Sequence, residues 1–299
     1  MCGEPPFPRD RLAGIGDEAA PGLDGQLAAL GRLGWGALEL RSVDGTAVAD
    51  LDDGTFRDAA ERVRDAGLDV VCLASRIGNW ARPVTGPFAD DLAELDILAE
   101  RCHALDCRYV RIMSYPNDGL AEPEWAARAI DRVGCLADRA EQAGLTLLHE
   151  NCAGWAGDRA DRMLRLVREV GSPALRLLFD TGNGVPHGYD AFGTLEKVLP
   201  HVAHVHVKDA VRAPDGTVAY TLPGDGHARV ADSLRLLLET GYTGTFSLEP
   251  HLAFRPHEEP DARDGTQDPF VEAGRRLERV LARLAPYARP AAVPEGARR

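Results

Sequence analysis

The sequence predicts a single-domain α/β protein built as a closed (β/α)₈ barrel. Eight short apolar runs alternate with amphipathic stretches along the 299 residues. Several amphipathic stretches end in a glycine directly before the next apolar run, as at Leu33-Gly34 and Ala143-Gly144, which is typical of helices that lead into strands. The length also suits this barrel, which typically takes about 250 residues. Repeated strand–helix units generate a parallel sheet, and eight of them close into a barrel.

The predicted elements follow one another in strict alternation. The strands are expected at 12–16, 36–40, 68–74, 109–113, 145–150, 175–180, 202–208 and 244–249, and the helices at 26–33, 55–66, 88–105, 124–143, 159–170, 191–198, 231–239 and 269–284. We expect a flexible segment over 1–10, the barrel over 11–285 and a disordered tail over 286–299, which is rich in Pro, Ala and Arg. A doubly wound dinucleotide-binding sheet is the alternative, but no GxGxxG segment supports it.

Composition narrows the range of partners. The net charge of −13 argues against nucleic acid, and the densest arginine cluster, over 275–283, has the spacing of a solvated helix face. No apolar run approaches the ~20 residues that span a bilayer, and the first residues lack the apolar core of a signal peptide. The six cysteines form no CxxC motif, which is typical of reduced thiols in a cytoplasmic protein.

Metal-binding side chains close four consecutive predicted strands: Glu150, Asp180, His206 and Glu249. In this fold the active site lies at the carboxyl ends of the strands. Because side chains alternate between faces, we expect Glu150 to face inward and His149 to face the helices as a hydrogen-bonded packing residue. His204 is expected one layer below His206. Three carboxylates in one mouth repel each other, and a divalent cation offsets that repulsion. The alternative is a charged ring without a metal. The donor set suits Mn²⁺, Mg²⁺, Co²⁺ or Fe²⁺ better than structural zinc.

The chain resembles the xylose isomerase-like sugar phosphate isomerase/epimerase superfamily. The resemblance lies in GWGALELR (34–41), HEN (149–151), FDTGN (179–183), HVHVKD (204–209), PGDG (223–226) and SLEPH (247–251). It implies one divalent metal held by the four residues above, with Mn²⁺ as the expected ion and Mg²⁺, Co²⁺, Fe²⁺ or Zn²⁺ as alternatives. It also implies that Glu150 and Glu249 exchange protons with a small carbohydrate-like substrate through an enediolate. Barrels of this kind often form homo-oligomers.

Further residues near the expected mouth are candidates for substrate binding: Lys208, Arg212, His187, Trp155, Asn183, Glu39 and Arg41. Trp155 has a second interpretation, in which it pins its glycine-rich loop. Arg76, Trp80, Arg111 and His251 also lie near the mouth, and Cys152 closely follows Glu150.

The same motifs leave the reaction open. Asn183 stands where the related ketohexose 3-epimerases tend to have a histidine, whereas Lys208-Asp209 resembles the inosose dehydratase and isomerase branches. The leading hypothesis is an isomerase or epimerase of a sugar, keto-sugar or keto-cyclitol. The alternatives are a lyase, acting as a keto-cyclitol or dehydroshikimate-type dehydratase or cleaving keto-C-glycosides, and a non-catalytic ligand-binding barrel. The early strands lack the histidines of endonuclease IV, which argues against DNA repair.

Overall fold

Eight parallel strands close into a barrel in the computed structural model, which describes residues 7–252, 254–255 and 268–289. Around the barrel the order is β1-β12-β9-β8-β7-β6-β5-β2. The strands span Leu12–Ile15 (β1), Ala37–Leu40 (β2), Asp69–Ala74 (β5), Tyr109–Ser114 (β6), Thr146–Gly154 (β7), Leu175–Asp180 (β8), Val202–Val207 (β9) and Phe246–Leu248 (β12). This confirms the predicted fold class.

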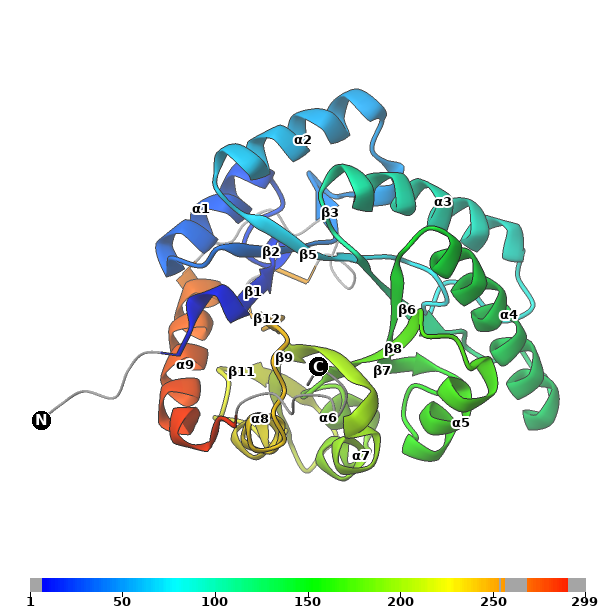
Figure 1. The fold of residues 1–299 in the computed structure, drawn as a ribbon. Coiled ribbons are helices and arrows are strands. Elements are labelled where there is room, and N and C mark those ends of the chain that lie inside the picture. The colour runs from blue at the N-terminus through cyan, green and yellow to red at the C-terminus, as the bar shows by residue number, and fades with distance from the viewer. Residues whose placement is uncertain (1–6, 253, 256–267, 290–299) are drawn as a thin grey trace, which may run out of the picture.

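The helices form a ring outside the strands (Figure 1). They span Leu23–Leu33 (α1), Asp53–Asp65 (α2), Phe88–Ala104 (α3), Glu122–Gln142 (α4), Ala160–Val170 (α5), Ala191–Val198 (α7), Val230–Glu239 (α8) and Asp268–Leu284 (α9), with a short α6 at Gly184–His187. Short 3₁₀ turns lie at Arg9–Arg11, Gly16–Glu18, Val48–Asp50, Leu199–His201 and Ala285–Tyr287. Each of the eight predicted long helices is present, and α1 begins three residues earlier than expected. No helix in the described ranges has the length and apolar composition that crossing a bilayer requires.

Local sequence explains where the helices stop. Gly34 ends α1 in the left-handed conformation, with φ of 69°, and its N–H donates a hydrogen bond to the carbonyl of Gly31. Gly171 ends α5 in the same conformation, with φ of 66°. Glycine adopts this conformation without the steric penalty of a Cβ atom, so the chain can turn at once into the next strand.

The core has two layers. The larger layer lies between the strands and the helices, and the smaller one fills the barrel with Cys72, Leu148 and Leu178. Phe270 of α9 packs against β1, where a Cβ atom on Gly14 would lie 2.6 Å from the Phe270 ring. A glycine in β1 therefore lets the last helix close against the first strand. Phe7 is buried with its ring 5.9 Å from that of Phe246, so the expected N-terminal freedom does not extend to this residue. Residues 1–6 and 290–299 of the expected flexible segments lie outside the described residues.

Two hairpins were not predicted from the sequence. One pairs Ser42–Val43 (β3) with Thr46–Ala47 (β4), and the other pairs Asp209–Arg212 (β10) with Val218–Thr221 (β11). The second hairpin follows β9 directly. The Asp209 carboxylate accepts hydrogen bonds from the backbone N–H groups of Gly224, Gly226 and Ala228 at 2.9–3.1 Å. This buried carboxylate fixes the whole loop between β9 and α8 at the mouth of the barrel.

Candidate metal centre and active site

The four acidic and histidine side chains predicted from the strand ends lie together at the mouth. Glu150, Asp180, His206 and Glu249 each offer one ligand atom, and these atoms lie within 4.8 Å of one another. All four residues are buried, with 6% exposure at most. Parallel register sets this cluster, since Asp180 pairs with His206 across β8 and β9. Glu249 follows β12, whose Ser247 pairs with His206.

The donor atoms of the cluster suit a cation. Asp180 Oδ1 accepts the backbone N–H groups of Gly182 and Asn183, both at 2.7 Å, which leaves Oδ2 turned toward the cluster. Asp180 Oδ2 and His206 Nδ1 are buried and make no hydrogen bond of good geometry among the described residues, although Lys208 Nζ lies 3.0 Å from Asp180 Oδ2 and Glu249 Oε2 lies 3.2 Å from His206 Nδ1. Buried polar atoms without such partners are uncommon. A divalent cation would satisfy both atoms, so the residues fit the implied metal.

Glu39 supports the cluster from inside the barrel. Its carboxylate lies 3.0 Å from His206 Nε2 and 2.9 Å from His204 Nε2 and is completely buried. A carboxylate on one ring nitrogen fixes the tautomer and orientation of an imidazole that binds metal through the other. The sequence suggested Glu39 as a substrate-binding residue. Its burial beneath His206 instead gives it contacts with the two histidines, and it is not among the described residues that line the cavity.

The charges at the mouth are closely balanced. Burial would raise the pKa of Glu150, but His206 and the Arg111 guanidinium outweigh burial and lower it to about 2. Burial would also raise the pKa of Glu249, which Lys208 and His206 hold well below its usual value. Burial raises the pKa of Asp180 to about 6 despite the nearby Lys208. The two glutamates are therefore held as carboxylates, the form that binds cations and accepts protons.

A cavity of about 340 Å³ opens above the cluster. Four of the predicted substrate-binding residues line it, namely Arg41, Asn183, His187 and Lys208. Trp80, Arg111, Cys152 and His251, which the sequence placed near the mouth, also line it, together with Glu150 and Glu249. The sequence gave no signal for Met113, Ala153, Pro186 and Tyr220, which complete the wall. Tyr220 reaches it on the unpredicted β10–β11 hairpin, where its ring lies 4.7 Å from that of His251.

Cationic groups of the wall bind the two glutamates directly. Lys208 Nζ lies 3.0 Å from both Glu249 Oε2 and Asp180 Oδ2. Arg111 donates to Glu150 at 3.1 Å, and Arg41 donates to Glu249 at 3.1 Å. Asn183 also donates to Glu150, at 3.0 Å. Each glutamate is thus oriented by a guanidinium group and a second donor.

Arg41 and His251 are held by two acids that the sequence did not single out. Asp17 and Glu18, in the turn after β1, are almost completely buried. Arg41 lies 2.8 Å from Asp17 and 3.2 Å from Glu18, and the His251 ring lies 2.7 Å from Glu18. The sequence did offer a signal for these two acids, because Asp17-Glu18 directly follows the first predicted strand, at the expected mouth of the barrel.

Two other predicted substrate-binding residues lie outside the cavity wall. Trp155 is completely buried and donates from its indole N–H to Glu122 at 3.0 Å, which matches the alternative interpretation that it pins its loop. Arg212 donates to the backbone carbonyls of Val185 and Pro186 at 2.7 Å. Its guanidinium therefore fixes the segment that carries His187. Trp155 is held in the core and Arg212 is held by loop carbonyls, so neither lies in the cavity wall where the sequence analysis expected it.

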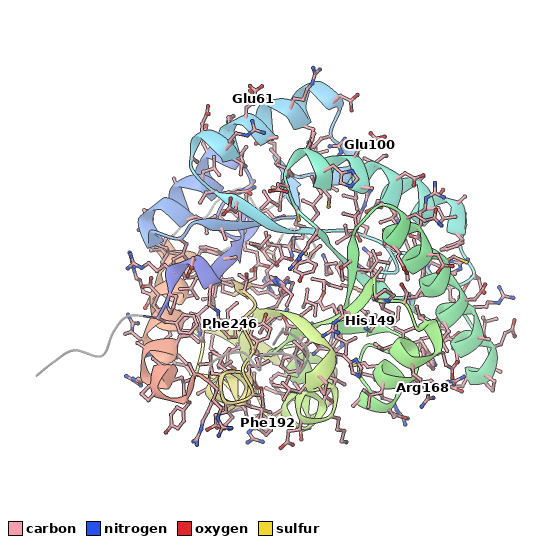
Figure 2. The ribbon with its side chains drawn as sticks, viewed as in Figure 1. Glu61, Glu100, His149, Arg168, Phe192 and Phe246 are labelled. Carbon is pink, nitrogen blue, oxygen red and sulfur yellow. The ribbon has the colours of Figure 1, made fainter. Side chains whose placement is uncertain are left out.

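His149 packs between the barrel and the helices without hydrogen bonds. Figure 2 shows it inside the molecule, away from surface side chains such as Glu61 and Arg168. The sequence predicted a hydrogen-bonded packing residue, but among the described residues neither ring nitrogen has a partner. Burial lowers its pKa from 6.5 to about 4, against a small opposing effect of Glu150. The structure therefore agrees with the predicted packing role of His149 and shows no side-chain hydrogen bond for it among the described residues.

We expect His149→Leu to stabilise the protein. Removing unpaired buried nitrogens should raise the free energy of unfolding by about 1–2 kcal/mol at pH 7.5. Below pH 6.5 the unfolded chain binds a proton that the folded histidine does not, so the wild type loses stability as the pH falls toward 4. The advantage of the variant should grow by about 1 kcal/mol at pH 5.5. Urea unfolding at both pH values measures it, with the exposed His103→Leu as the control. Equal stability of the variant and the wild type at both pH values would contradict this account.

A closed barrel with buried carboxylates and an open cavity at its C-terminal mouth is the architecture of a barrel enzyme. The family model described as xylose isomerase-like TIM barrel matches residues 27–273. The chain therefore belongs to the xylose isomerase-like TIM barrel family, and the relatives that it matches are enzymes.

Three similar proteins illustrate the range of that family. Inosose dehydratase 1 of Bacillus cereus is 31% identical over 143 residues, which cover 43% of this chain and 47% of the dehydratase. The match therefore spans about half the length of that relative. The 2-epi-5-epi-valiolone 7-phosphate 2-epimerase of Actinoplanes sp. is 30% identical over 229 residues, covering 73% of this chain and 74% of the epimerase. The IOLI protein, solved with a bound zinc atom, superposes with a TM-score of 0.71 at 18% identity, covering 93% of this chain and 99% of that one.

Proposed function

We propose that the protein is a divalent-metal-dependent isomerase or epimerase of a sugar, keto-sugar or keto-cyclitol. The observation that carries this proposal is the pair of ionised glutamates, Glu150 and Glu249, which both line the cavity and both belong to the candidate metal cluster. They project from β7 and from the end of β12, which lie apart in the barrel order. A substrate that binds in the cavity above the cluster would have one of these carboxylates on either side. The epimerase relative, which aligns over 73% of the chain, supports this reading.

Each step of the proposed reaction has a group to perform it. One glutamate removes the proton from the carbon next to the substrate carbonyl, which requires a carboxylate within hydrogen-bond reach. The other glutamate returns a proton, either to the opposite face of that carbon or to the neighbouring carbon. Arg111 and Arg41 hold the two carboxylates in place through the contacts at 3.1 Å. Lys208, Asn183 and His187 present polar atoms toward the hydroxyl groups of a polyol.

The cation would be held by Glu150, Asp180, His206 and Glu249. When bound there, it would polarise the carbonyl and the adjacent hydroxyl and stabilise the charge of the enediolate. Three carboxylates and one imidazole favour Mn²⁺ among the divalent ions, with Mg²⁺, Co²⁺, Fe²⁺ and Zn²⁺ as alternatives. Titration of metal-stripped protein with each ion, followed by calorimetry, ranks them.

Deuterium exchange tests the proposal. The protein is incubated with an inosose in D₂O with Mn²⁺, and the recovered compound is analysed by mass spectrometry and NMR. We expect deuterium on the carbon next to the carbonyl in a product of otherwise unchanged mass. Exhaustive dialysis against EDTA should abolish the exchange, and Mn²⁺ should restore it. Full exchange after EDTA treatment would refute the metal requirement.

A dehydratase is the second candidate, and Lys208 is the observation that favours it. Its ammonium lies in the cavity wall, and Asp180 and Glu249 raise its pKa although burial opposes them. A fixed ammonium charge can donate a hydrogen bond to a departing hydroxyl group and stabilise the negative charge that develops on its oxygen. The inosose dehydratase relatives and the Lys208-Asp209 pair point the same way. A product lighter by one water in the exchange experiment would select this reaction over epimerisation.

A further inference from the structure

Two cysteines meet where α3 ends, at the end of the barrel opposite the metal cluster. Cys102 lies in the last turn of α3 and Cys107 lies just before β6. The Cys107 N–H donates to the Cys102 carbonyl at 2.9 Å, and the Asp106 N–H donates to the His103 carbonyl at 3.4 Å. Asp106 adopts the left-handed conformation with φ of 53°. These are the two hydrogen bonds and the backbone turn of a Schellman motif.

This motif explains why the two thiols are in contact. In a Schellman motif the residue two positions after the last helical cap packs against the residue in the final helical turn. Here those positions are occupied by Cys107 and Cys102. Both sulfurs approach the same Tyr109 carbonyl oxygen, at 4.0 Å for Cys102 and 3.6 Å for Cys107, and each thiol shifts the pKa of the other. Two thiols that face each other across a helix end and share one acceptor are close neighbours, as disulfide formation requires.

The pair is also reachable from outside. A cavity of about 710 Å³ is lined by both cysteines and by residues that precede the strands, such as Arg108 and Gly144. It therefore opens at the N-terminal end of the barrel. Cys107 is 6% exposed, whereas Cys102 is fully buried. The hydrogen bond from Cys102 lowers the pKa of Cys107, although burial opposes this effect. Cys107 is thus the thiol that is better placed to react first.

We propose that Cys102 and Cys107 form a reversible intrachain disulfide when the protein meets a small-molecule disulfide. The Cys107 thiolate attacks one sulfur of that disulfide and releases a small thiolate. The Cys102 thiolate then attacks the Cys107 sulfur of the mixed disulfide and releases the second small thiolate. The protein loses two electrons and two protons, and the small disulfide is reduced to two thiols. The new bond ties the end of α3 to the entry of β6, the strand that carries Arg111.

Peptide mapping tests the proposal directly. Arg101 and Arg108 flank the pair, so trypsin releases both cysteines in one peptide, 102–108. The full-length protein is equilibrated with mixtures of oxidised and reduced glutathione, quenched in acid, alkylated and digested. We expect the oxidised peptide to take up no alkyl group and to lack two hydrogen atoms. Cys107→Ala should take up one alkyl group in this peptide, and the exposed Cys135→Ser should behave as wild type.

The same titration in concentrated urea separates a property of the fold from one of the short peptide. Because the folded chain holds the thiols in contact, the equilibrium constant for the disulfide should be at least about tenfold higher in the native protein than in urea. A native constant equal to or below the constant in urea would overturn the proposal. So would a native peptide 102–108 that remains fully alkylated while Cys135 forms its mixed disulfide.

Discussion

Replacement of Glu249 by glutamine is expected to lower turnover by about 10²–10⁴-fold, the usual contribution of a positioned acid or base. The amide keeps the shape of the side chain but cannot accept the substrate proton. It also removes a charge that Lys208, Arg41 and His206 contact at 3.0–3.2 Å. We therefore expect weaker metal binding as well.

Turnover of the Glu249→Gln variant is to be measured at saturating metal, so that the loss of proton transfer is separated from the loss of metal. The matched control is Glu239→Gln, the same chemical change on the outer face of α8, where Glu239 pairs with Arg235 at the surface. The control should retain wild-type rates. Turnover of the Glu249 variant within twofold of wild type, with metal bound, would remove Glu249 from the proton-transfer step.

Replacement of Glu39 by glutamine is expected to weaken metal binding about 10–100-fold without altering the cavity wall. The carboxylate contacts the Nε2 atoms of both His206 and His204 within 3.0 Å. An amide has one oxygen to offer and turns a donor group toward the second imidazole. Burial lowers the pKa of His206, and the negative charge of Glu39 is the main effect that keeps this pKa well above its usual value. A neutral amide removes that attraction.

Calorimetric titration with Mn²⁺ measures the effect, and thermal unfolding with and without metal provides an independent readout. Glu94→Gln is the matched control, because Glu94 is a buried carboxylate that pairs with Arg76 and Arg82 outside the cluster. A purely structural role for Glu39 would lower the unfolding temperature of both variants and leave the metal dissociation constant unchanged. That outcome would refute the positioning role.

The sequence predicted the barrel because the information for it is local. Each strand is a short apolar run, each long helix has an apolar face, and several helices have an ending signal such as Gly34 or Gly144. Alternation of side chains within a strand separated Glu150 from His149 and ranked His206 above His204. The structure agrees with both, although the roles of the four residues as metal ligands remain predictions.

The remaining features depend on contacts between distant segments. Alternation gives the face of a strand on which Glu39 lies but not its depth, so its position beneath His206 rather than in the cavity was not predictable. The sequence left two interpretations of Trp155 open, and the hydrogen bond from its indole N–H to Glu122, 33 residues away, decides between them. The hairpin that carries Tyr220 has a weak strand pattern and depends on Asp209, whose three loop contacts span up to 19 residues. Long-range hydrogen bonds of this kind leave no periodic trace.

The candidate cation donors and the upper cavity wall lie on different parts of the fold, and this separation has a consequence for engineering. The candidate cation donors stand at the ends of strands and are braced from below by Glu39, whereas Tyr220 stands on a hairpin that Asp209 holds as a unit. Grafting that hairpin from another member of the family, with Asp209 and its glycine partners retained, would change the shape of the upper wall and leave the candidate ion-binding base untouched. Selectivity could then evolve, or be redesigned, separately from the chemistry beneath it.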